Sequence, residues 1–284
     1  AEVQEPTGLK ADLRIYQKKG YDWLGFLNEQ RWGGILADDM GLGKTLQTLS
    51  LLLREKENGA SQPNLIVMPT SLVYNWRAEA KKFAPDLRVL IHTGSNRTKN
   101  PANFAIYDLI LTTYGIVRQD LEILKEFPFH YVVLDESQMI KNPESKTAKA
   151  VKQLLAQHRL SLTGTPLENS LMDLWSQMEF LNPGLLGTQR FFKDFYLQPI
   201  EKSQDKDRQS QLKTLIHPFI LRRHKEQVAH ELPPKVEQRH FCEMTGEQKR
   251  IYEQTKPAYR NYLLNLAPGE FKSHRLGILA GLHP

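Results

Sequence analysis

The chain has 284 residues, of which 40% are hydrophobic and 25% charged, and this is the composition of a globular protein that can bury a core. Its one cysteine, Cys242, excludes an internal disulfide, and no apolar run approaches the ~18 residues that a membrane-spanning helix needs. The net charge of +6 is compatible with a polyanionic partner but does not identify one.

Short apolar runs alternate with amphipathic helical stretches along the first two thirds of the chain. Several of these runs are apolar at consecutive positions, as expected for strands covered on both faces. The alternation favours an α/β fold in which a mostly parallel sheet is built with right-handed crossovers. The expected strands are Gly34–Ala37, Leu65–Met68, Val89–His92, Leu109–Thr112, Tyr131–Leu134 and Leu160–Leu162.

Three of the helices expected between these strands have recognisable starts. One covers Ser71–Phe83, and a second covers Glu144–Leu155 behind the N-cap candidate Asn142. A third begins at Ser170 and carries an apolar stripe that faces the core.

After Pro183 the pattern changes. Residues 184–232 are predicted to be mostly helical, with a mobile loop at the polar stretch Glu201–Gln211. One more strand is expected at Val236–Met244 and a helix at Glu247–Leu266. We therefore expect three parts: a main α/β domain at 1–183, a helical insertion packed on it at 184–232, and a last strand with a helical connector at 233–284.

Residues 38–45 read Asp38-Asp39-Met40-Gly41-Leu42-Gly43-Lys44-Thr45, directly after an apolar strand. Glycines in such a turn let backbone N–H groups close around an anion, and a helix follows. The lysine reaches the outer phosphates of a nucleotide, and the threonine hydroxyl can hold Mg²⁺. The stretch therefore predicts a nucleoside triphosphate site. The residues expected to bind the nucleotide here are Gly41, Leu42, Gly43, Lys44, Thr45 and Leu46.

The strict phosphate-loop pattern has a glycine five residues before Gly43, where this chain has Asp38. The alternative to a phosphate loop is a tight turn between a strand and a helix. Because the following helix carries leucines on one face, strand, loop and helix come in the required order, and this favours the nucleotide interpretation.

Asp135 and Glu136 follow the expected strand Tyr131–Leu134. In an open parallel sheet, ligands bind beyond the carboxyl ends of the strands, so these acids belong to the same edge as the glycine loop. Asp135 would hold Mg²⁺ through water, and Glu136 would orient or deprotonate the attacking water. The alternative is a solvated pair of acids at a strand end.

Two further motifs carry a weaker signal. The hydroxyls of Thr163-Gly164-Thr165 could contact Glu136 or the terminal phosphate and relay its state, although chemistry alone favours a plain turn. The amide of Gln17 can donate and accept at once, which fits the edge of adenine, but a lone upstream glutamine is more often a surface residue.

Together these elements resemble the Swi/Snf-type ATPases of helicase superfamily two, the motors of chromatin remodelling and related bacterial proteins. In that family Asp38 is the usual residue at its loop position. Ser137 departs from the usual alanine or glycine, and Gln138 leans toward a bacterial member. The residues that carry the resemblance are Leu13-Arg14 with Tyr16-Gln17; Leu36 to Thr45; Pro69-Thr70-Ser71-Leu72 with Asn75-Trp76; Thr112-Thr113-Tyr114; Asp135-Glu136-Ser137-Gln138 with Ile140-Lys141-Asn142; Leu162 to Asn169; and Pro218-Phe219-Ile220-Leu221-Arg222-Arg223 with Lys225, running to Leu232-Pro233-Pro234-Lys235.

The resemblance implies a RecA-like, P-loop, three-layer ATP-binding lobe at 1–183, with ATP and Mg²⁺ as cofactors and DNA-dependent hydrolysis as the activity. It implies catalytic roles for Lys44, Asp135 and Glu136, Mg²⁺ at Thr45 and Asp135, nucleotide contact by Gln17, and coupling through Thr163, Gly164 and Thr165. The residues that match motifs touching the DNA phosphate backbone are Pro69, Thr70, Ser71, Thr112, Thr113 and Tyr114, and such contacts carry no base information.

The sequence does not assign a role to the basic residues Arg222, Arg223 and Lys225. These cations could bind a nucleic-acid backbone, pair with acids such as Glu226, or dock a second lobe. The family motor has two RecA-like lobes with ATP between them, and the second lobe supplies arginines. We therefore expect this chain to be the first lobe with its connector. Without the arginines of the second lobe, it should hydrolyse ATP poorly.

The expected partners are double-stranded DNA, a second lobe and a possible protein partner; the expected location is the bacterial cytoplasm at the nucleoid, or the nucleus if the source is eukaryotic. Two alternatives remain. The chain could be a nucleotide- and DNA-binding module that serves as a protein-interaction platform, or an RNA-helicase-type ATPase lobe.

Overall fold

The structure is a computed structural model that describes residues 2–164, 170–231 and 245–264. The chain forms two compact units, Ala1–Pro233 and Pro234–Pro284. In the second unit the structure describes the helix α11 (Gly246–Leu264), as predicted for that stretch. The strand predicted at Val236–Met244 lies outside the described residues. None of the described helices is long and apolar enough to cross a membrane.

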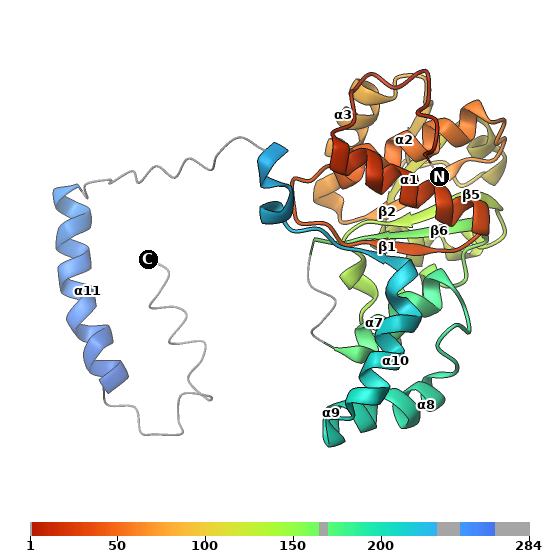
Figure 1. Cartoon of the computed structure of the whole chain (residues 1–284). Coiled ribbons are helices and arrows are strands. Elements are labelled where there is room, and N and C mark those ends of the chain that lie inside the picture. Colours follow the sequence, from red (N-terminus) through yellow and green to blue (C-terminus); the bar gives the residue numbers. More distant parts are fainter. Residues whose placement is uncertain (1, 165–169, 232–244, 265–284) are drawn as a thin grey trace. The chain divides into compact units, whose positions relative to one another are not determined.

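The first unit is built on a sheet whose described strands follow the order β3-β4-β2-β5-β6-β1-β7, and every strand pairing is parallel (Figure 1). The six predicted strands are confirmed, and β7 was not predicted. The strands are β1 (Gly34–Leu36), β2 (Asn64–Met68), β3 (Val89–Ile91), β4 (Leu109–Thr113), β5 (Phe129–Leu134), β6 (Ala156–Leu162) and β7 (Ile220–Leu221).

Side chains of the central strands alternate between two hydrophobic clusters, because successive residues of a strand point to opposite faces. Ile35 lies in one cluster and Leu36 in the other, and Val132 and Val133 divide in the same way. The first three helices cover one face, and α7 and α10 lie on the other (Figure 1). This is the predicted three-layer α/β architecture. The helices up to this point are α1 (Ile15–Gln30), α2 (Lys44–Glu57), α3 (Val73–Phe83), α4 (Tyr114–Gln119), α5 (Leu121–Leu124), α6 (Lys146–Val151) and α7 (Leu171–Leu181).

The region after α7 is helical, as predicted, and it packs on the hydrophobic cluster that contains Ile35, through Phe192, Tyr196 and Leu212. The mobile loop predicted at Glu201–Gln211 is wrong. Asp205 caps a helix there, because its side chain accepts from two backbone N–H groups and the helix buries Leu212. The elements are α8 (Gln189–Phe192), the π-helical turn η5 (Lys193–Leu197), α9 (Gln198–Ser203) and α10 (Lys206–Ile216).

Of the two predicted helix caps, one is confirmed and one is wrong. Ser170 is the N-cap of α7, and its side chain accepts from the N–H of Met172. The cap predicted at Asn142 is wrong, because Asn142 closes a local turn onto the N–H of Glu144, and Ser145 caps α6. Short 3₁₀ turns complete the unit: η1 (Thr70–Leu72), η2 (Pro101–Ile106), η3 (Ser137–Ile140), η6 (His217–Phe219) and η7 (Lys225–Glu231).

Candidate active site

The phosphate loop connects the buried strand β1 to α2, at the carboxyl edge of the sheet. Gly41 and Gly43 have φ values of 83° and 80°, a left-handed region that glycine adopts without strain. A side chain at position 43 would also overlap the amide nitrogen of Gln17. The α-helix begins at Lys44, so its first backbone N–H groups are free to bind an anion at the loop.

Lys44 lies half-buried inside this loop. Its ammonium donates to the backbone carbonyls of Asp38 at 2.6 Å and Asp39 at 3.3 Å. Burial lowers the pKa of Lys44, although the charges of Asp38 and Asp135 oppose the shift. A desolvated ammonium held by two neutral carbonyls is well placed to exchange them for anionic phosphate oxygens.

Asp38 and Arg223 form a buried ion pair at the start of the loop. The guanidinium Nε donates to Asp38 Oδ1 at 2.9 Å, Nη2 donates to Oδ2, and the backbone N–H of Arg223 donates to Oδ1 at 3.1 Å. The Asp38 side chain is 0% exposed and that of Arg223 is 13% exposed. The aspartate at this loop position therefore anchors Arg223. Of the uses that the sequence left open for this arginine, the structure shows pairing with an acid, Asp38.

The residues after β7 cover the loop from the same side. The N–H of Asp39 donates to the carbonyl of Arg223 at 3.0 Å, and the N–H of Lys225 donates to Asp39 Oδ2 at 3.0 Å. Further along, Val228 forms a small apolar cluster with Tyr16 and Leu42. The segment 222–228 therefore fixes both aspartates of the loop, a feature that the sequence analysis missed.

Gln17 is buried rather than at the surface. Its Oε1 accepts from the N–H of Arg14 at 3.0 Å, and its Nε2 donates weakly to the carbonyl of Leu42 at 3.4 Å. The amide is therefore attached to the phosphate loop, and its predicted contact with adenine stays a prediction.

The acid pair lies at the end of β5 on the same edge. Asp135 Oδ2 accepts from Trp76 Nε1 at 2.7 Å, and Oδ1 accepts from the N–H of Glu136 at 2.9 Å. Burial raises the pKa of Asp135, while the Trp76 hydrogen bond and Lys44 oppose the shift. Glu136 has a φ of 50°, a strained conformation of the kind that concentrates at functional sites.

The turn after β6 reaches the acid pair through one intermediate residue. Thr163 Oγ1 donates to Gln138 Oε1 at 3.2 Å, and Gln138 Nε2 donates to Glu136 Oε2 at 2.6 Å. A side chain at Gly164 would lie 3.7 Å from Lys44 Nζ, so this turn also abuts the phosphate loop. Thr165 lies outside the described residues.

Ser137, the departure from the family pattern, is fully buried. Its hydroxyl donates to Gln177 Oε1 at 2.7 Å, so the extra polar group is satisfied by α7. The serine therefore fits this position, in agreement with its small size.

Carboxylate and hydroxyl oxygens are the hard donors that Mg²⁺ accepts, usually alongside retained waters. Asp135 offers such oxygens at the end of β5, and Thr45 offers a hydroxyl in the first turn of α2. The donor chemistry of these two residues fits the predicted Mg²⁺ role.

The residues predicted to contact DNA fall into two groups. Thr70 and Ser71 are exposed and follow β2 at the carboxyl edge, with Pro69 half-buried before them. The hydroxyls of the second group are engaged inside the fold. Their internal partners are the carbonyl of His92 for Thr112, the N–H of Ile116 for Thr113 and the carbonyl of Asp135 for Tyr114.

The chain is similar in sequence to proteins of one known family. Residues 16–279 match the family described as SNF2-related domain. The chain is 42% identical over 279 residues to YwqA of Bacillus subtilis, which is named as an ATP-dependent helicase/translocase. The match covers 96% of this chain and 30% of YwqA. It is 41% identical over 273 residues to the TATA-binding protein-associated factor MOT1 of Saccharomyces cerevisiae, covering 87% of this chain and 15% of MOT1.

Among solved structures, the chain resembles the SWI2/SNF2 ATPase core of Sulfolobus solfataricus in complex with double-stranded DNA. The TM-score is 0.77 at 42% identity, and the match covers 99% of this chain and 59% of that chain. The chain thus spans about three fifths of that core and less than a third of YwqA and of MOT1.

Proposed function

This chain belongs to the SNF2-related domain family, and we propose that it is the first ATP-binding lobe of an ATP-driven translocase of double-stranded DNA. The observation that carries the proposal is the convergence of three motifs on one edge of the sheet. The phosphate loop, the acid pair and the Thr163 turn come from separate strands, and hydrogen bonds or close approaches join them there.

In the proposed mechanism, the backbone N–H groups of the loop and of the first turn of α2 hold the triphosphate. Lys44 turns from the carbonyls of Asp38 and Asp39 to the phosphate oxygens. Bound Mg²⁺ would neutralise charge on the phosphates, held by Thr45 and, through water, by Asp135. Glu136 orients the attacking water and accepts its proton, with Gln138 and Thr163 fixing the carboxylate.

We propose weak hydrolysis by this chain alone. In phosphoryl transfer, an arginine supplied from another domain contributes a factor of about 10³–10⁵ in rate. The solved SWI2/SNF2 core that this chain resembles is longer, since the chain covers 59% of it. We propose that the whole protein includes a second lobe and binds a protein partner.

Titration calorimetry with ATP and Mg²⁺ tests the nucleotide site. We expect the wild-type chain to bind, and Lys44→Ala to remove detectable binding because the outer phosphates lose their cation. Lys81→Ala, which removes an exposed lysine of α3, is the matched control and should bind like the wild type. Equal affinities for the wild type and Lys44→Ala would refute the assignment of the loop.

A further inference from the structure

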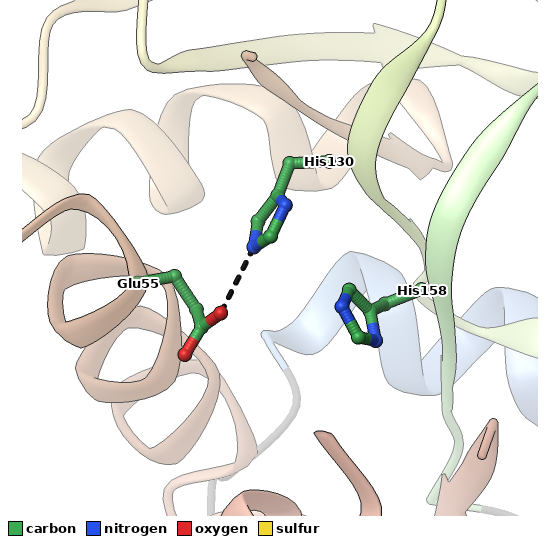
Figure 2. Close-up of side chains that lie close together, drawn as sticks. All are labelled: Glu55, His130 and His158. Carbon is green, nitrogen blue, oxygen red and sulfur yellow. Dashed lines mark hydrogen bonds and ion pairs between the residues drawn. The ribbon is translucent and has the colours of Figure 1, made fainter. Parts of the chain in front are cut away.

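Three side chains with metal-ligating atoms meet at the amino-terminal edge of the sheet, opposite the phosphate loop. Glu55 lies in the last turn of α2, His130 near the start of β5 and His158 near the start of β6. Figure 2 shows the carboxylate and both imidazole rings facing a common space, and one donor atom from each lies within 4.8 Å of the others. The proposed function uses none of the three.

The carboxylate of Glu55 is held in its charged form. Burial opposes the charge, but hydrogen bonds from His130 and Asn28 and the charge of Arg54 outweigh it and lower the pKa of Glu55. Oε2 accepts from Asn28 Nδ2 at 3.1 Å, while Oε1 pairs with Arg54. Glu55 is therefore an anionic oxygen donor at neutral pH.

His130 is oriented by a hydrogen bond on the far side of its ring. Its Nδ1 lies 3.1 Å from Gln157 Oε1, and because an amide oxygen only accepts, Nδ1 carries the proton. Its Nε2 lies 3.0 Å from Glu55 Oε2. Metal-bound histidines commonly donate their second ring N–H in this way. Glu55 Oε2 only accepts, so Nε2 donates to it when no ion is present, and a bound ion would take the place of that proton.

His158 is a neutral ring with an unsatisfied nitrogen. Its ring stacks on Tyr131, with centroids 4.8 Å apart and an interplanar angle of 19°. Within the part of the chain that the structure describes, its buried Nδ1 has no hydrogen-bond partner. Burial, followed by the charge of His130, lowers the pKa of His158 to about 4. A buried polar atom without a partner calls for an explanation, and a neutral imidazole is the form that binds metals.

We propose that Glu55, His130 and His158 form a binding site for a Zn²⁺-class divalent transition-metal ion, with water as the fourth ligand. Two imidazoles and one carboxylate are a known donor set for such ions, which leave an open position for water. Bonds of about 2.0–2.2 Å bring tetrahedral donors to about 3.3 Å from one another. Binding therefore draws the His158 ring toward the other two donors by up to about 1.5 Å.

A cavity of about 460 Å³ adjoins the site at His158. His158 lines the cavity together with Gln157, Arg159 and Arg31. We expect an ion to enter past His158 and to take its water ligand from this cavity. Because it opens at the amino-terminal edge of the strands, ion binding does not compete with a nucleotide at the phosphate loop.

A bound ion would join three elements whose opposite ends build the nucleotide site. The helix α2 starts at Lys44, β5 ends just before Asp135, and β6 ends just before Thr163. The ion would replace the Glu55–His130 contact by two coordinate bonds and add a third from His158. Its expected effect is to stabilise the folded lobe, since ion binding to the native state raises its stability.

The first test uses tag-free chain stripped with EDTA, titrated with ZnCl₂ by calorimetry and followed by thermal unfolding, without nucleotide. We expect saturable binding and a higher unfolding temperature. Loss of an outer residue that only orients a metal ligand already lowers metal affinity by about 10–100-fold. Glu55→Gln and His158→Gln each remove a ligand, so each should lower the affinity by at least that factor. His217→Gln, an exposed histidine of η6, is the control and should keep the full affinity.

Wild-type affinity in both Glu55→Gln and His158→Gln would overturn the site, since Zn²⁺ would then bind elsewhere. A second measurement needs no variant: anomalous diffraction at the zinc edge from a wild-type crystal soaked in ZnCl₂. A peak between the three donors supports the proposal, and its absence there overturns it. Neither result depends on ATP binding, so failure here is distinct from failure of the proposed function.

Discussion

Asp38 and Arg223 hold the phosphate loop together although they are 185 residues apart. The loop sequence and the acid pair could be predicted because each motif is local and its chemistry dictates residue types at fixed spacing. The ion pair could not, because both its residues are common ones and only the parallel pairing of β1 with β7 brings them together. Their burial makes the pair a strong constraint on the start of the loop.

Breaking this pair should cost stability and nucleotide affinity together. Removing one partner of a buried ion pair leaves an uncompensated charge and costs about 3–5 kcal/mol. We expect Arg223→Gln to lower the free energy of unfolding by about that amount in urea titrations and to weaken ATP binding. Adding Asp38→Asn should recover part of the stability, because the stranded charge is removed.

Arg88→Gln is the control for this experiment. Arg88 also makes two hydrogen bonds to one carboxylate, that of Asp108, but its side chain is 59% exposed. The guanidinium of Arg88 lies in water and Lys56 also pairs with Asp108, so this change should be nearly silent. A similar small loss in Arg223→Gln would show that the buried pair does not hold the loop.

Gly43 offers a second test at the scale of one residue. Alanine at a positive φ costs about 1–2 kcal/mol anywhere in the chain. At position 43 the methyl group would also overlap Gln17, whereas at Gly59, with a φ of 94°, it would meet no atom within 4 Å. We expect Gly59→Ala to show only the conformational cost in urea unfolding. Gly43→Ala should show a larger loss and weaker ATP binding, and equal losses would refute the packing argument.

The elements show where a sequence pattern suffices and where it does not. Six strands were predicted because each is a short apolar run, and several of these runs are apolar at consecutive positions, the pattern that burial on both faces requires. The strand β7 escaped prediction because it contains only Ile220 and Leu221, too few residues for any periodicity. The parts of α9 and α10 within Glu201–Gln211 were predicted as a loop because that stretch is polar. Leu212 is the buried side chain that attaches α10 to the core.

The element β3 and the loop after it carry a pH-dependent contribution to stability. His92 is 1% exposed; its Nε2 lies 3.0 Å from Asp120 Oδ2, and Arg97 pairs with the same carboxylate. Burial lowers the pKa of His92 from its ordinary 6.5, although Asp120 opposes the shift. The unfolded chain therefore binds more protons than the folded chain just below pH 6.5, and stability falls as the pH falls through that range.

We expect the urea midpoint of the wild type to drop between pH 7.5 and pH 5. His92→Gln should reduce this slope whatever its stability at pH 7.5, leaving the part that His158 contributes. His217→Gln, an exposed histidine, should retain the wild-type slope. An unchanged slope in His92→Gln would assign the pH dependence to other groups.

At the scale of the whole molecule, the two edges of one sheet carry two kinds of chemistry. The carboxyl edge gathers the phosphate loop, the acid pair and the exposed Thr70 and Ser71, while the opposite edge gathers Glu55 and the two histidines. The fold class and most of the carboxyl edge followed from the sequence. The histidine site did not, since its three residues lie in separate elements with no spacing that marks a metal site.

DNA binding at the carboxyl edge should be dependent on salt and indifferent to base sequence. If about two to three phosphates are neutralised, affinity for duplex DNA falls about 10- to 40-fold between 50 and 200 mM salt. Fluorescence anisotropy with two unrelated duplexes should give the same curve. The variant with Thr70→Ala and Ser71→Ala should bind more weakly, while Thr214→Ala on α10 should not. A strong base preference, or tighter binding of duplex RNA, would contradict the proposal.

The most direct measurement is a crystal structure of the chain with Mg²⁺ and a non-hydrolysable ATP analogue. We expect the triphosphate against residues 41–45, with Lys44 Nζ moved from the carbonyls of Asp38 and Asp39 onto a phosphate oxygen. We expect the metal between the phosphates and the Thr45 and Asp135 side chains. An analogue bound away from this edge, with Lys44 still on the two carbonyls, would contradict this expectation.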